Sequence, residues 1–440
     1  MTVDSPFLTY KGGQASERSF SGRSMASPGS SIAAILFSTG LFLMGNGLIG
    51  TLTPLRAHGE GFSDIALGAL GAWYFLGFVI GCFAGPHLLS RVGHIRAFAV
   101  AAALVAVSVL IQPLWTNPTA WFAARGLTGL SMAVLYMAVE SWLNDRASNE
   151  TRGRLLSLYI VVNLSALLLG QWLLLLAEPQ SFELFSIGAM FYCLCVIPIG
   201  LTRLPAPQPR ATPRLDLARI FTVSPVGAAG CLTVGLANGA FWTLAPLYAQ
   251  SLGFNTREVA LFMSVFIAGG ALVQWPLGRI SDGMDRRWVI AAICTAASFC
   301  GLVLGVLGWL LVRAPQIFFG VVFIFGASML PLYSLSVAHA NDRLPRSDFV
   351  EASAGLLMIN AAASIPGPLL ASFVISTAGP YSLFLYTAIA HAAMAFYAFT
   401  RMRVKEPAPP ETRDIFTPMP QGSPAALPLD PRGPTQDKSP

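Results

Sequence analysis

Two ten-residue stretches of this chain repeat each other at a distance of 192 residues. Asn46–Leu55 reads NGLIGTLTPL and Asn238–Leu247 reads NGAFWTLAPL, so six of the ten positions are identical. The shared residues include asparagine, threonine and proline, and chance similarity between two apolar helices explains such matches less well than a common origin. The two stretches therefore indicate that the chain is built from two homologous halves.

The repeat continues beyond these stretches. The same offset places Ser90 on Asp282 and His94 on Arg286 without a gap. Later matches have an offset of 197, and they pair Leu135-Tyr136 with Leu332-Tyr333 and Asn144-Asp145-Arg146 with Asn341-Asp342-Arg343. Parallel repeats of this kind are a common plan of membrane transporters, in which the substrate site lies between the halves near the bilayer midplane.

The composition indicates a polytopic membrane protein. Of 440 residues, 54% are hydrophobic and 11% are charged, with a mean hydropathy of +0.63. Soluble globular proteins carry about 25% charged residues. The net charge is +6, but the arginines fall at intervals between apolar runs, whereas a nucleic-acid surface needs them clustered. The six cysteines lie in apolar runs and have neither a disulfide framework nor a metal-ligand spacing.

Twelve apolar runs are long enough to cross a bilayer, which takes about 20 residues. The predicted fold is an all-α membrane protein with two pseudo-symmetric six-helix bundles. The bundles are residues 31–202 and 223–400, with a linker at 203–222, a disordered tail at 1–30 and a disordered Pro-rich tail at 401–440. The runs are 31–53, 66–89, 97–115, 119–143, 155–177, 184–202, 223–249, 258–278, 288–312, 315–341, 349–376 and 380–400.

The basic residues predict the orientation of these helices. With odd helices running outward, twenty Lys and Arg residues fall in the inner loops and tails, and three fall outside. Cytoplasmic loops of membrane proteins carry such an excess of basic residues. Both termini are therefore expected in the cytoplasm.

The loop after the eighth apolar run resembles a known signature. Gly278–Arg287 reads GRISDGMDRR, which resembles the pattern G-x-x-x-D-[RK]-x-G-x-[RK]-[RK] of the major facilitator superfamily. The resemblance implies that Gly278 lets two helices approach closely. It also implies that Asp282 pairs with Arg286, Arg287 or a helix end on the cytoplasmic side. Such a latch would stabilise the outward-facing state and break as the two halves rock.

This copy departs from the signature, because Gly283 replaces a basic residue and Asp285 replaces the second glycine. The first-half copy, Pro86–Arg96, reads PHLLSRVGHIR and has Ser90 where the signature has its aspartate. The acidic partner is therefore expected in the second half alone. Ordinary basic loops without a latch remain the alternative explanation.

The predicted helix 119–143 carries two charges, and charge inside hydrocarbon indicates a functional site. Arg125-x-x-x-Gly129 resembles a second superfamily motif, whose arginine is implicated in coupling or proton transfer. Arg125 is only about 9 Å from the outer end of the helix, so it could also extend to that surface. Glu140 lies about 22 Å further in and could exchange a proton. The favoured hypothesis is a cytoplasmic gate that joins Glu140 to loop arginines, namely Arg91, Arg152 or Arg154.

Polar and aromatic residues inside the apolar runs are candidates for a substrate cavity. Asn46 and Asn238 occupy equivalent positions in the repeat, as two facing half-sites would. For each candidate, an interhelical hydrogen bond that only stabilises packing is the alternative. His339, near the inner end of its run, is a candidate proton carrier. The predicted cavity residues are Asn46, Thr51, Tyr136, Asn163, Gln171, Asn238, Trp242, Gln274, Tyr333 and Asn360.

One branch of the superfamily is more similar than the rest. The chain resembles bacterial inner-membrane permeases that have no settled substrate, over residues 31–400. The Gly-Pro pair of drug antiporters is missing from the fifth run, although Gly367-Pro368 stands in the eleventh. The strings that carry the resemblance are Val139-Glu140-Ser141, Arg152-Gly153-Arg154-Leu155-Leu156, Gly170-Gln171 and Gln274-Trp275-Pro276-Leu277-Gly278-Arg279.

These features predict a multi-pass transporter of the bacterial inner membrane. We expect secondary active transport by alternating access of a small neutral or amphipathic organic solute, coupled to protons, by a monomer without a cofactor. A facilitative uniporter, a drug-type efflux antiporter and, in a different class, a non-transporting receptor or scaffold are the alternatives. No Walker A, H-E-x-x-H or G-x-S-x-G motif occurs, so neither an ATP-driven pump nor an enzyme is expected. The expected partners are the bilayer, the solute and protons, without nucleic acid.

Overall fold

The structure is a computed structural model of the 440-residue chain. It describes residues 28–202, 207, 216–311, 315–404, 406, 409 and 413–432. The predicted N-terminal tail lies almost wholly outside the described residues, and so does most of the predicted linker. Within this part of the chain the regular structure is helical, and twelve helices are long and apolar enough to cross a membrane, as the sequence predicts.

The first half forms spans one to six. Its fifth span ends in a short 3-10 turn, and its sixth consists of two consecutive helices. The elements are α1 (Pro28–Gly59), α2 (Asp64–Val92), α3 (His94–Leu114), α4 (Pro118–Arg146), α5 (Arg152–Trp172), η1 (Leu173–Leu176), α6 (Glu183–Leu194) and α7 (Val196–Leu201).

The second half forms spans seven to twelve. A short helix in the predicted linker precedes it, and a 3-10 helix in the C-terminal tail follows it. The elements are α8 (Leu217–Val223), α9 (Pro225–Ser251), α10 (Thr256–Asp282), α11 (Arg286–Trp309), α12 (Pro315–Met329), α13 (Pro331–Asn341), η2 (Arg346–Asp348), α14 (Phe349–Ala363), α15 (Pro366–Ala378), α16 (Ser382–Val404) and η4 (Pro424–Leu429).

Two spans of the second half are broken, and both breaks come directly before a proline. Span ten breaks at Leu330, before Pro331, and span eleven breaks after Ala363, before Pro366. Proline has no backbone N–H and its ring crowds the preceding turn, so a helix interior does not continue smoothly through it. The break in span eleven therefore lies just before Gly367-Pro368.

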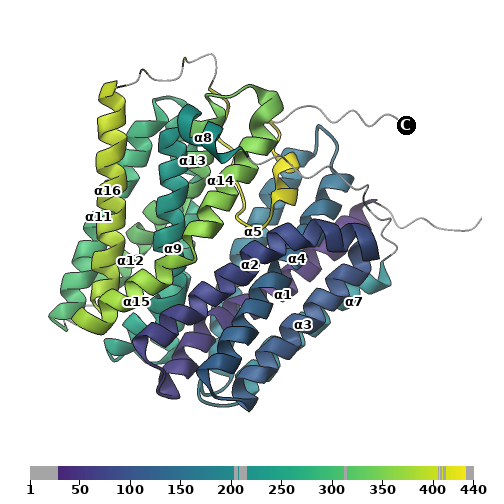
Figure 1. Ribbon diagram of the computed structural model, residues 1–440, viewed down its shortest axis with the longest axis vertical. Helices are drawn as coiled ribbons and strands as arrows, with labels where there is room; N and C mark the ends of the chain where they lie inside the picture. Colours follow the sequence, from purple (N-terminus) through teal and green to yellow (C-terminus); the bar gives the residue numbers. More distant parts are fainter. Residues whose placement is uncertain are drawn as a thin grey trace, which may run out of the picture.

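The two halves repeat the same helix pairings. In the first half α1 packs on α5, α2 on α4 and α3 on α6. In the second half α9 packs on α14, α10 on α12 and α11 on α16. These pairs join the same spans in each bundle, so the packing has the pseudo-symmetry that the sequence repeat predicts. Figure 1 shows the halves side by side, the first in purple and blue and the second in teal and green.

Glycines allow α2 and α4 to approach closely. A Cβ atom added at Gly77 would lie 1.9 Å from the carbonyl oxygen of Gly126, and one added at Gly129 would lie 1.9 Å from that of Tyr74. Both neighbours are backbone atoms, which cannot rotate away. Small residues at such contacts let backbones approach and gain van der Waals packing, which drives helix association in membranes.

Replacing Gly77 with alanine is expected to destabilise the first bundle by about 1–3 kcal/mol, because the two helix backbones must separate. The matched control is Gly320→Ala in α12, where nothing lies within 4 Å of an added Cβ atom. Thermal unfolding in detergent measures both variants. Equal midpoints for the two variants would contradict the close packing of α2 on α4.

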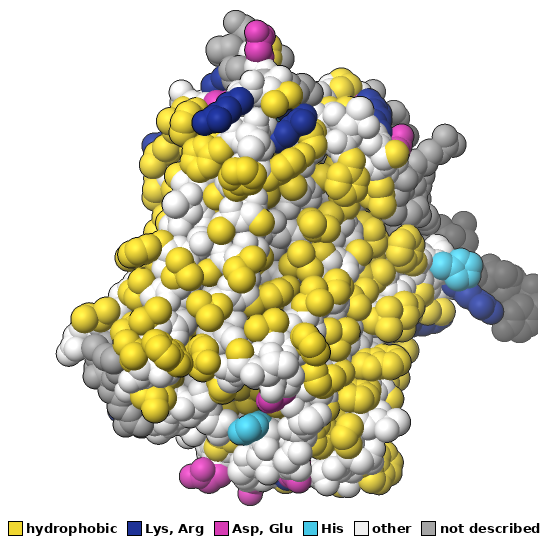
Figure 2. Space-filling model, turned by 60° about the vertical axis from the view of Figure 1, so that its left-hand side comes forward, with side chains coloured by type: hydrophobic (Ala, Val, Ile, Leu, Met, Phe, Trp, Pro, Cys, Tyr) yellow, Lys and Arg dark blue, Asp and Glu magenta, His cyan; other side chains and the backbone are white. Residues whose placement is uncertain are grey.

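The molecule has two chemically different ends. At the first, which we call the arginine-rich end, α2, α4, α10 and α16 finish, and each has an arginine in its last turn. At the opposite, acidic end, α2 and α10 begin with Asp64 and Glu258 in their first turns. Figure 2 shows a broad belt of hydrophobic side chains below a cap that carries several Lys and Arg side chains.

The two halves touch each other toward the acidic end. A Cβ atom added at Gly68 in α2 would meet Ser372 and Pro368 of α15, and one added at Gly71 would meet Thr243 of α9. Toward the arginine-rich end η4 lies in a groove between the halves, where it packs on α4 and α5 of the first half and on α14 of the second. The direct contacts between bundles therefore close one end of the space between them.

The C-terminal region differs from its prediction. The sequence predicts a disordered tail over 401–440, but α16 continues to Val404, and residues 413–432 pack against both bundles. In this segment Phe416, Met419 and Leu427 are at most 7% exposed. Figure 1 shows the segment, in yellow, near α4, α5 and α14. We call residues 413–432 the tail segment.

Candidate substrate cavity

A cavity of about 300 Å³ lies between the two bundles. The first half contributes α1, α2, α4 and α5 to its wall, and the second half contributes α9, α10, α13 and α14. The tail segment adds its residues 419–422. Clefts of 300–1,000 Å³ are typical of sites for small organic molecules. Its place between the repeated halves is the one that the sequence predicts for a substrate site.

Nine of the ten predicted cavity residues line this space. They combine amides, a hydroxyl and two aromatic rings, and they come from both halves. The exception is Tyr333, which is fully buried in α13 away from the cavity lining. The nine are Asn46, Thr51, Tyr136, Asn163, Gln171, Asn238, Trp242, Gln274 and Asn360.

Two of the lining amides are held by hydrogen bonds within the protein. The Thr51 hydroxyl donates to Gln171 Oε1 at 2.6 Å, and Gln171 Nε2 donates to the carbonyl oxygen of Gly47 at 3.0 Å. Gln274 Nε2 donates to the Ser334 hydroxyl at 3.1 Å. Gln171 therefore ties α5 to α1, and Gln274 ties α10 to α13. Their first role is to hold helices together.

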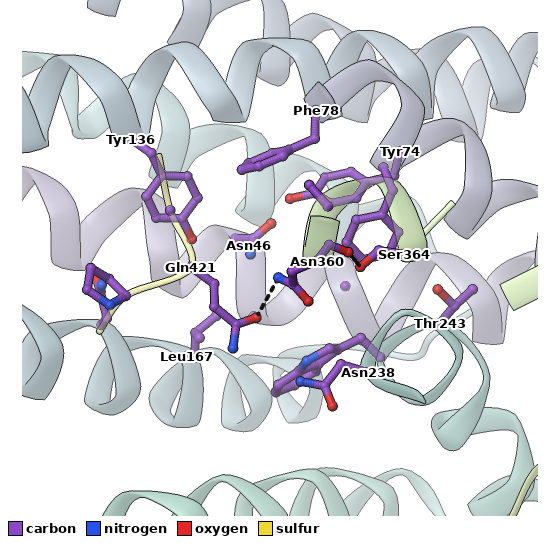
Figure 3. A pocket seen from close by; sticks show the side chains of 18 of the residues that line it. Asn46, Tyr74, Phe78, Tyr136, Leu167, Asn238, Thr243, Asn360, Ser364 and Gln421 are labelled. Atoms are coloured by element: carbon purple, nitrogen blue, oxygen red, sulfur yellow. Dashed lines mark hydrogen bonds between the residues drawn. The ribbon is translucent and has the colours of Figure 1, made fainter. Parts of the chain in front are cut away.

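Other amides keep unused hydrogen-bonding groups. Neither side-chain polar atom of Asn238 has a partner among the described residues, although the residue is only 5% exposed. The side-chain oxygens of Asn163 and Asn360 are also without a partner there. Figure 3 shows Asn238 and Asn360 among the side chains around the cavity. Buried polar groups without partners are rare, so these atoms are candidates to bind a solute.

Arg125 lies in the wall of the cavity. Its guanidinium carbon is 4.6 Å from the centre of the Tyr74 ring, and both residues line the space. The alternative that Arg125 extends to the outer surface does not agree with this position. Its Nε atom has no hydrogen-bond partner among the described residues. The structure therefore places one positive charge at the cavity, although the solute predicted from the sequence is neutral or amphipathic.

Several lining residues are missing from the prediction. Thr243 is the repeat partner of Thr51 and could have been found from the offset of 192. Tyr74 and Phe78, four residues apart on α2, also line the cavity and share one helix face. Figure 3 shows the rings of Tyr74, Phe78 and Tyr136 along one side of the space. The tail residues gave no signal at all in the sequence.

The predicted latch of the second half forms a buried charge cluster. Arg286 Nε donates to Asp342 Oδ2 at 2.7 Å, and its Nη1 donates to Asp282 Oδ1 at 3.0 Å. Arg287 pairs with Asp285 at 2.6 Å. Burial raises the pKa of Asp342, an effect that Arg286 opposes. Burial would also raise the pKa of Asp285, but hydrogen bonds from Arg287 hold it below its ordinary value.

Glu140 has other partners than the predicted arginines. It is fully buried and accepts hydrogen bonds from the Tyr159 hydroxyl at 2.8 Å and from the Ser423 hydroxyl of the tail segment. Among the ion pairs of the described residues, none joins Glu140 to an arginine. Arg91 and Arg154 are exposed, whereas Arg152 is buried. In the structure Glu140 therefore contacts the hydroxyls of Tyr159 and Ser423 and not the predicted loop arginines.

The two remaining predicted coupling residues do not line the cavity. His339 is 3% exposed in α13, and it interacts electrostatically with the charges of Arg343 and Asp285. Gly278 does not face another helix, because the nearest atoms to an added Cβ all belong to Phe416 of the tail segment. The close approach predicted for this glycine is thus made with the tail.

The fold consists of two helical bundles related by a repeat, with an apolar belt around them and a cavity between them. This combination defines a membrane transport protein. Residues 35–312 and 230–431 match the model of the Major Facilitator Superfamily. The chain therefore belongs to the major facilitator superfamily, whose members are transporters and not enzymes.

Known proteins of this family are similar along most of the chain. The uncharacterized MFS-type transporter YcaD of Escherichia coli is 26% identical over 361 residues, which cover 80% of this chain and 92% of YcaD. The crystal structure of the nucleoside transporter NupG superposes with a TM-score of 0.69 at 14% identity, and covers 85% of this chain and 100% of NupG. The crystal structure of a bacterial homolog of the human lysosomal transporter Spinster, in an inward-facing and occupied conformation, superposes with a TM-score of 0.72 at 13% identity. It covers 87% of this chain and 97% of that homolog.

Proposed function

We propose that this chain is a secondary active transporter that works by alternating access. The cavity lies between two halves of related packing, and direct contacts between the halves lie toward its acidic end. Rocking of one bundle against the other would expose such a site to each side in turn. The excess of basic residues favours an inner-membrane orientation with both termini in the cytoplasm.

The proposed solute is a small amphipathic organic molecule with a hydrogen-bond acceptor or a single negative charge. The lining combines aromatic rings with amides, and the unpartnered amide of Asn238 is the observation that carries the proposal. Arg125 is the charged side chain among the described lining residues, and no carboxylate accompanies it there. A cation would therefore meet repulsion without a countercharge, whereas an acceptor group would find a donor.

Two coupling modes are consistent with this site. Proton coupling is our proposal, with Arg125, Glu140 and His339 as the candidates for the proton pathway. A facilitative uniporter would need none of them. A drug-type antiporter is less favoured, because α5 contains no proline. A non-transporting receptor is the remaining alternative.

The test is uptake into proteoliposomes, with compounds first selected by a growth and toxicity screen of a deletion strain. We expect accumulation of a selected solute with an imposed pH gradient, and its loss with a proton ionophore. Asn238→Ala is expected to lower the uptake of that solute about tenfold, the effect of one or two lost hydrogen bonds. The control is Asn117→Ser, which keeps the N-cap of α4 at the acidic end. Uptake that stops at equal concentrations on both sides and does not respond to the pH gradient would favour the uniporter, and binding without uptake would favour the receptor.

A further inference from the structure

The tail segment occupies the groove between the two bundles at the arginine-rich end. Its helix η4 packs on α4 and α5 of the first half and on α14 of the second. Two of its leucines, Leu427 and Leu429, are at most 2% exposed. The segment continues to Arg432, which pairs with Asp430 at 2.6 Å in a buried site.

The second bundle holds the start of the segment through the charge cluster. Asp282 Oδ1 accepts a hydrogen bond from the backbone N–H of Phe416 at 2.8 Å. Arg286 donates to the backbone carbonyl of Asp414. The Ser334 hydroxyl accepts from the backbone N–H of Met419 at 3.0 Å. The residues of the predicted latch therefore bind the tail as well as one another.

Polar side chains of both bundles meet the middle of the segment. Asn360 Nδ2 of α14 donates to Gln421 Oε1 at 3.4 Å, as the dashed line in Figure 3 shows. On the opposite side the Ser423 hydroxyl donates to Glu140 of α4. Glu140 is a fully buried carboxylate that accepts hydrogen bonds from the hydroxyls of Tyr159 and Ser423. The segment thus supplies a hydrogen bond to a group that would be costly to leave unpaired.

Glycines on both sides of the contact make room for it. A Cβ atom added at Gly278 would lie 2.0 Å from the ring of Phe416. A Cβ atom added at Gly422 would lie 2.2 Å from Glu140 Oε1 and 2.9 Å from the ring of Tyr136. A groove and a segment that fit in this way are matched in shape, which is not expected of a tail that only rests on a surface.

The composition of the segment suits an extended peptide in a narrow groove. Five of its twenty residues are proline. Each proline removes a backbone N–H that would need a partner when buried, and restricts the free chain so that less entropy is lost on docking. The same prolines that suggest disorder in the sequence therefore favour binding once a groove exists.

The segment also forms part of the cavity wall. Met419, Pro420, Gln421 and Gly422 line the cavity from the side of the arginine-rich end. The bundles touch directly toward the acidic end. The cavity is thus bounded by helix contacts toward one end and by the tail segment toward the other.

We propose that the groove is a binding site for the chain's own C-terminal segment, which acts as a removable plug of the transport cavity. The docked segment completes the cavity floor and blocks passage at the arginine-rich end, and its release opens that passage. The inference rests on the proposed function in one respect, that the cavity is the transport path. The docking itself does not depend on it.

The first experiment measures docking by maleimide labelling of the full chain in lipid nanodiscs, in a background without the six native cysteines. One variant carries Ala426→Cys, at a position that is 0% exposed, and its control carries Ile415→Cys, at a position in the same segment that is 78% exposed. We expect the first to react at least about tenfold more slowly, as for a group exposed only on local opening. Equal rates would overturn the proposal.

The second experiment tests the plug. In the same background a cysteine at Asn360 is labelled in the full chain, in a chain that ends after Arg432 and in a chain that ends after Val404. We expect labelling to be at least about tenfold faster in the shortest chain alone. If the labelling rate at Asn360→Cys is the same with and without the tail segment, the proposal that the segment acts as a plug is overturned.

Two substitutions separate docking from folding. Gly278→Ala and Gly422→Ala are each expected to speed labelling at Ala426→Cys, because the segment no longer fits. Gly320→Ala and Gly200→Ala are the matched controls, since nothing lies within 4 Å of an added Cβ atom at either position. Gly278→Ala should not destabilise a chain that ends after Val404, because its clash partner is then missing. Destabilisation of that shorter chain, or labelling unchanged by both substitutions, would overturn the proposed fit.

Uptake then links docking to transport. Removal of the segment is expected to raise the initial uptake rate in proteoliposomes. A docked segment whose removal leaves uptake unchanged would overturn the plug and leave the proposed transport intact. Absence of uptake in both chains would overturn the proposed function, while the labelling results would still decide whether the segment docks.

Discussion

Replacing Arg286 with methionine is expected to lower the free energy of unfolding by about 3–5 kcal/mol, the cost of leaving a buried charge without its partner. Arg286 and Asp342 are 1% and 3% exposed, and Nε and Oδ2 are 2.7 Å apart. The substitution keeps most of the side-chain volume, so the loss reports the unpaired Asp342 carboxylate and the lost hydrogen bonds. Thermal and denaturant unfolding in detergent measure the effect.

A double substitution tests this explanation. Replacing both partners, as Arg286→Met with Asp342→Leu, removes the unpaired charge and is expected to recover most of the loss, as apolar replacements of buried ion pairs do. The control is Arg219→Met, whose pair with Asp348 is 47% exposed on the arginine side and is worth at most about 1 kcal/mol. If Arg286→Met is as stable as Arg219→Met, the pair of Arg286 with Asp342 does not hold the charge cluster together.

The fold could be predicted from the sequence because the bilayer imposes simple rules. Hydrocarbon requires long apolar helices, and the twelve apolar runs agree with the twelve candidate spans. The repeat of Asn46 and Asn238 showed the two halves, because polar residues at matching places in apolar helices stand out. Both asparagines line the cavity.

The choice of Tyr333 shows where counting along a helix fails. Its repeat partner Tyr136 lines the cavity, but Tyr333 follows the break before Pro331, while Leu330 and Ser334 line the cavity. A position counted along one continuous helix does not predict which side chain faces inward once the helix is interrupted. The proline was visible in the sequence, but its effect on the register was not.

The tail segment could not be predicted for a different reason. A Pro-rich sequence with few apolar residues cannot bury a core by itself, so disorder was the natural expectation. Its partners, Glu140, Asp282 and Asn360, come from three spans that are far apart along the chain. Only the assembled groove brings these groups together, and the predicted latch at Asp282 and the predicted gate at Glu140 both contact the same segment.

Arg125→Gln is expected to lower uptake of the transported solute by about 10–150-fold. A hydrogen bond to a charged group contributes about 1.5–3 kcal/mol, which corresponds to that range in affinity. Arg125 is suited to this role because its guanidinium faces the cavity beside Tyr74 and its Nε has no described partner. The sequence predicts the depth of Arg125 along its helix, but depth alone does not say whether the side chain turns to lipid or to the cavity.

Conservative variants separate charge from geometry. Arg125→Lys keeps the charge but loses the flat group that stacks on the ring, so we expect an intermediate loss. Tyr74→Phe keeps the ring face and is expected to retain most of the uptake. Arg257→Gln, at an exposed position in the first turn of α10, is the control for a lost surface charge and should be neutral.

The kinetic form of the loss identifies what Arg125 does. If Arg125 binds the solute, the KM for uptake rises and the maximal rate changes little. The interaction is then lost equally in the solute-bound ground state and in the transition state of transport. If it serves proton coupling, gradient-driven accumulation disappears while exchange of labelled for unlabelled solute continues. Uptake by Arg125→Gln within twofold of the unsubstituted protein would exclude both roles and leave Arg125 as a packing partner of Tyr74.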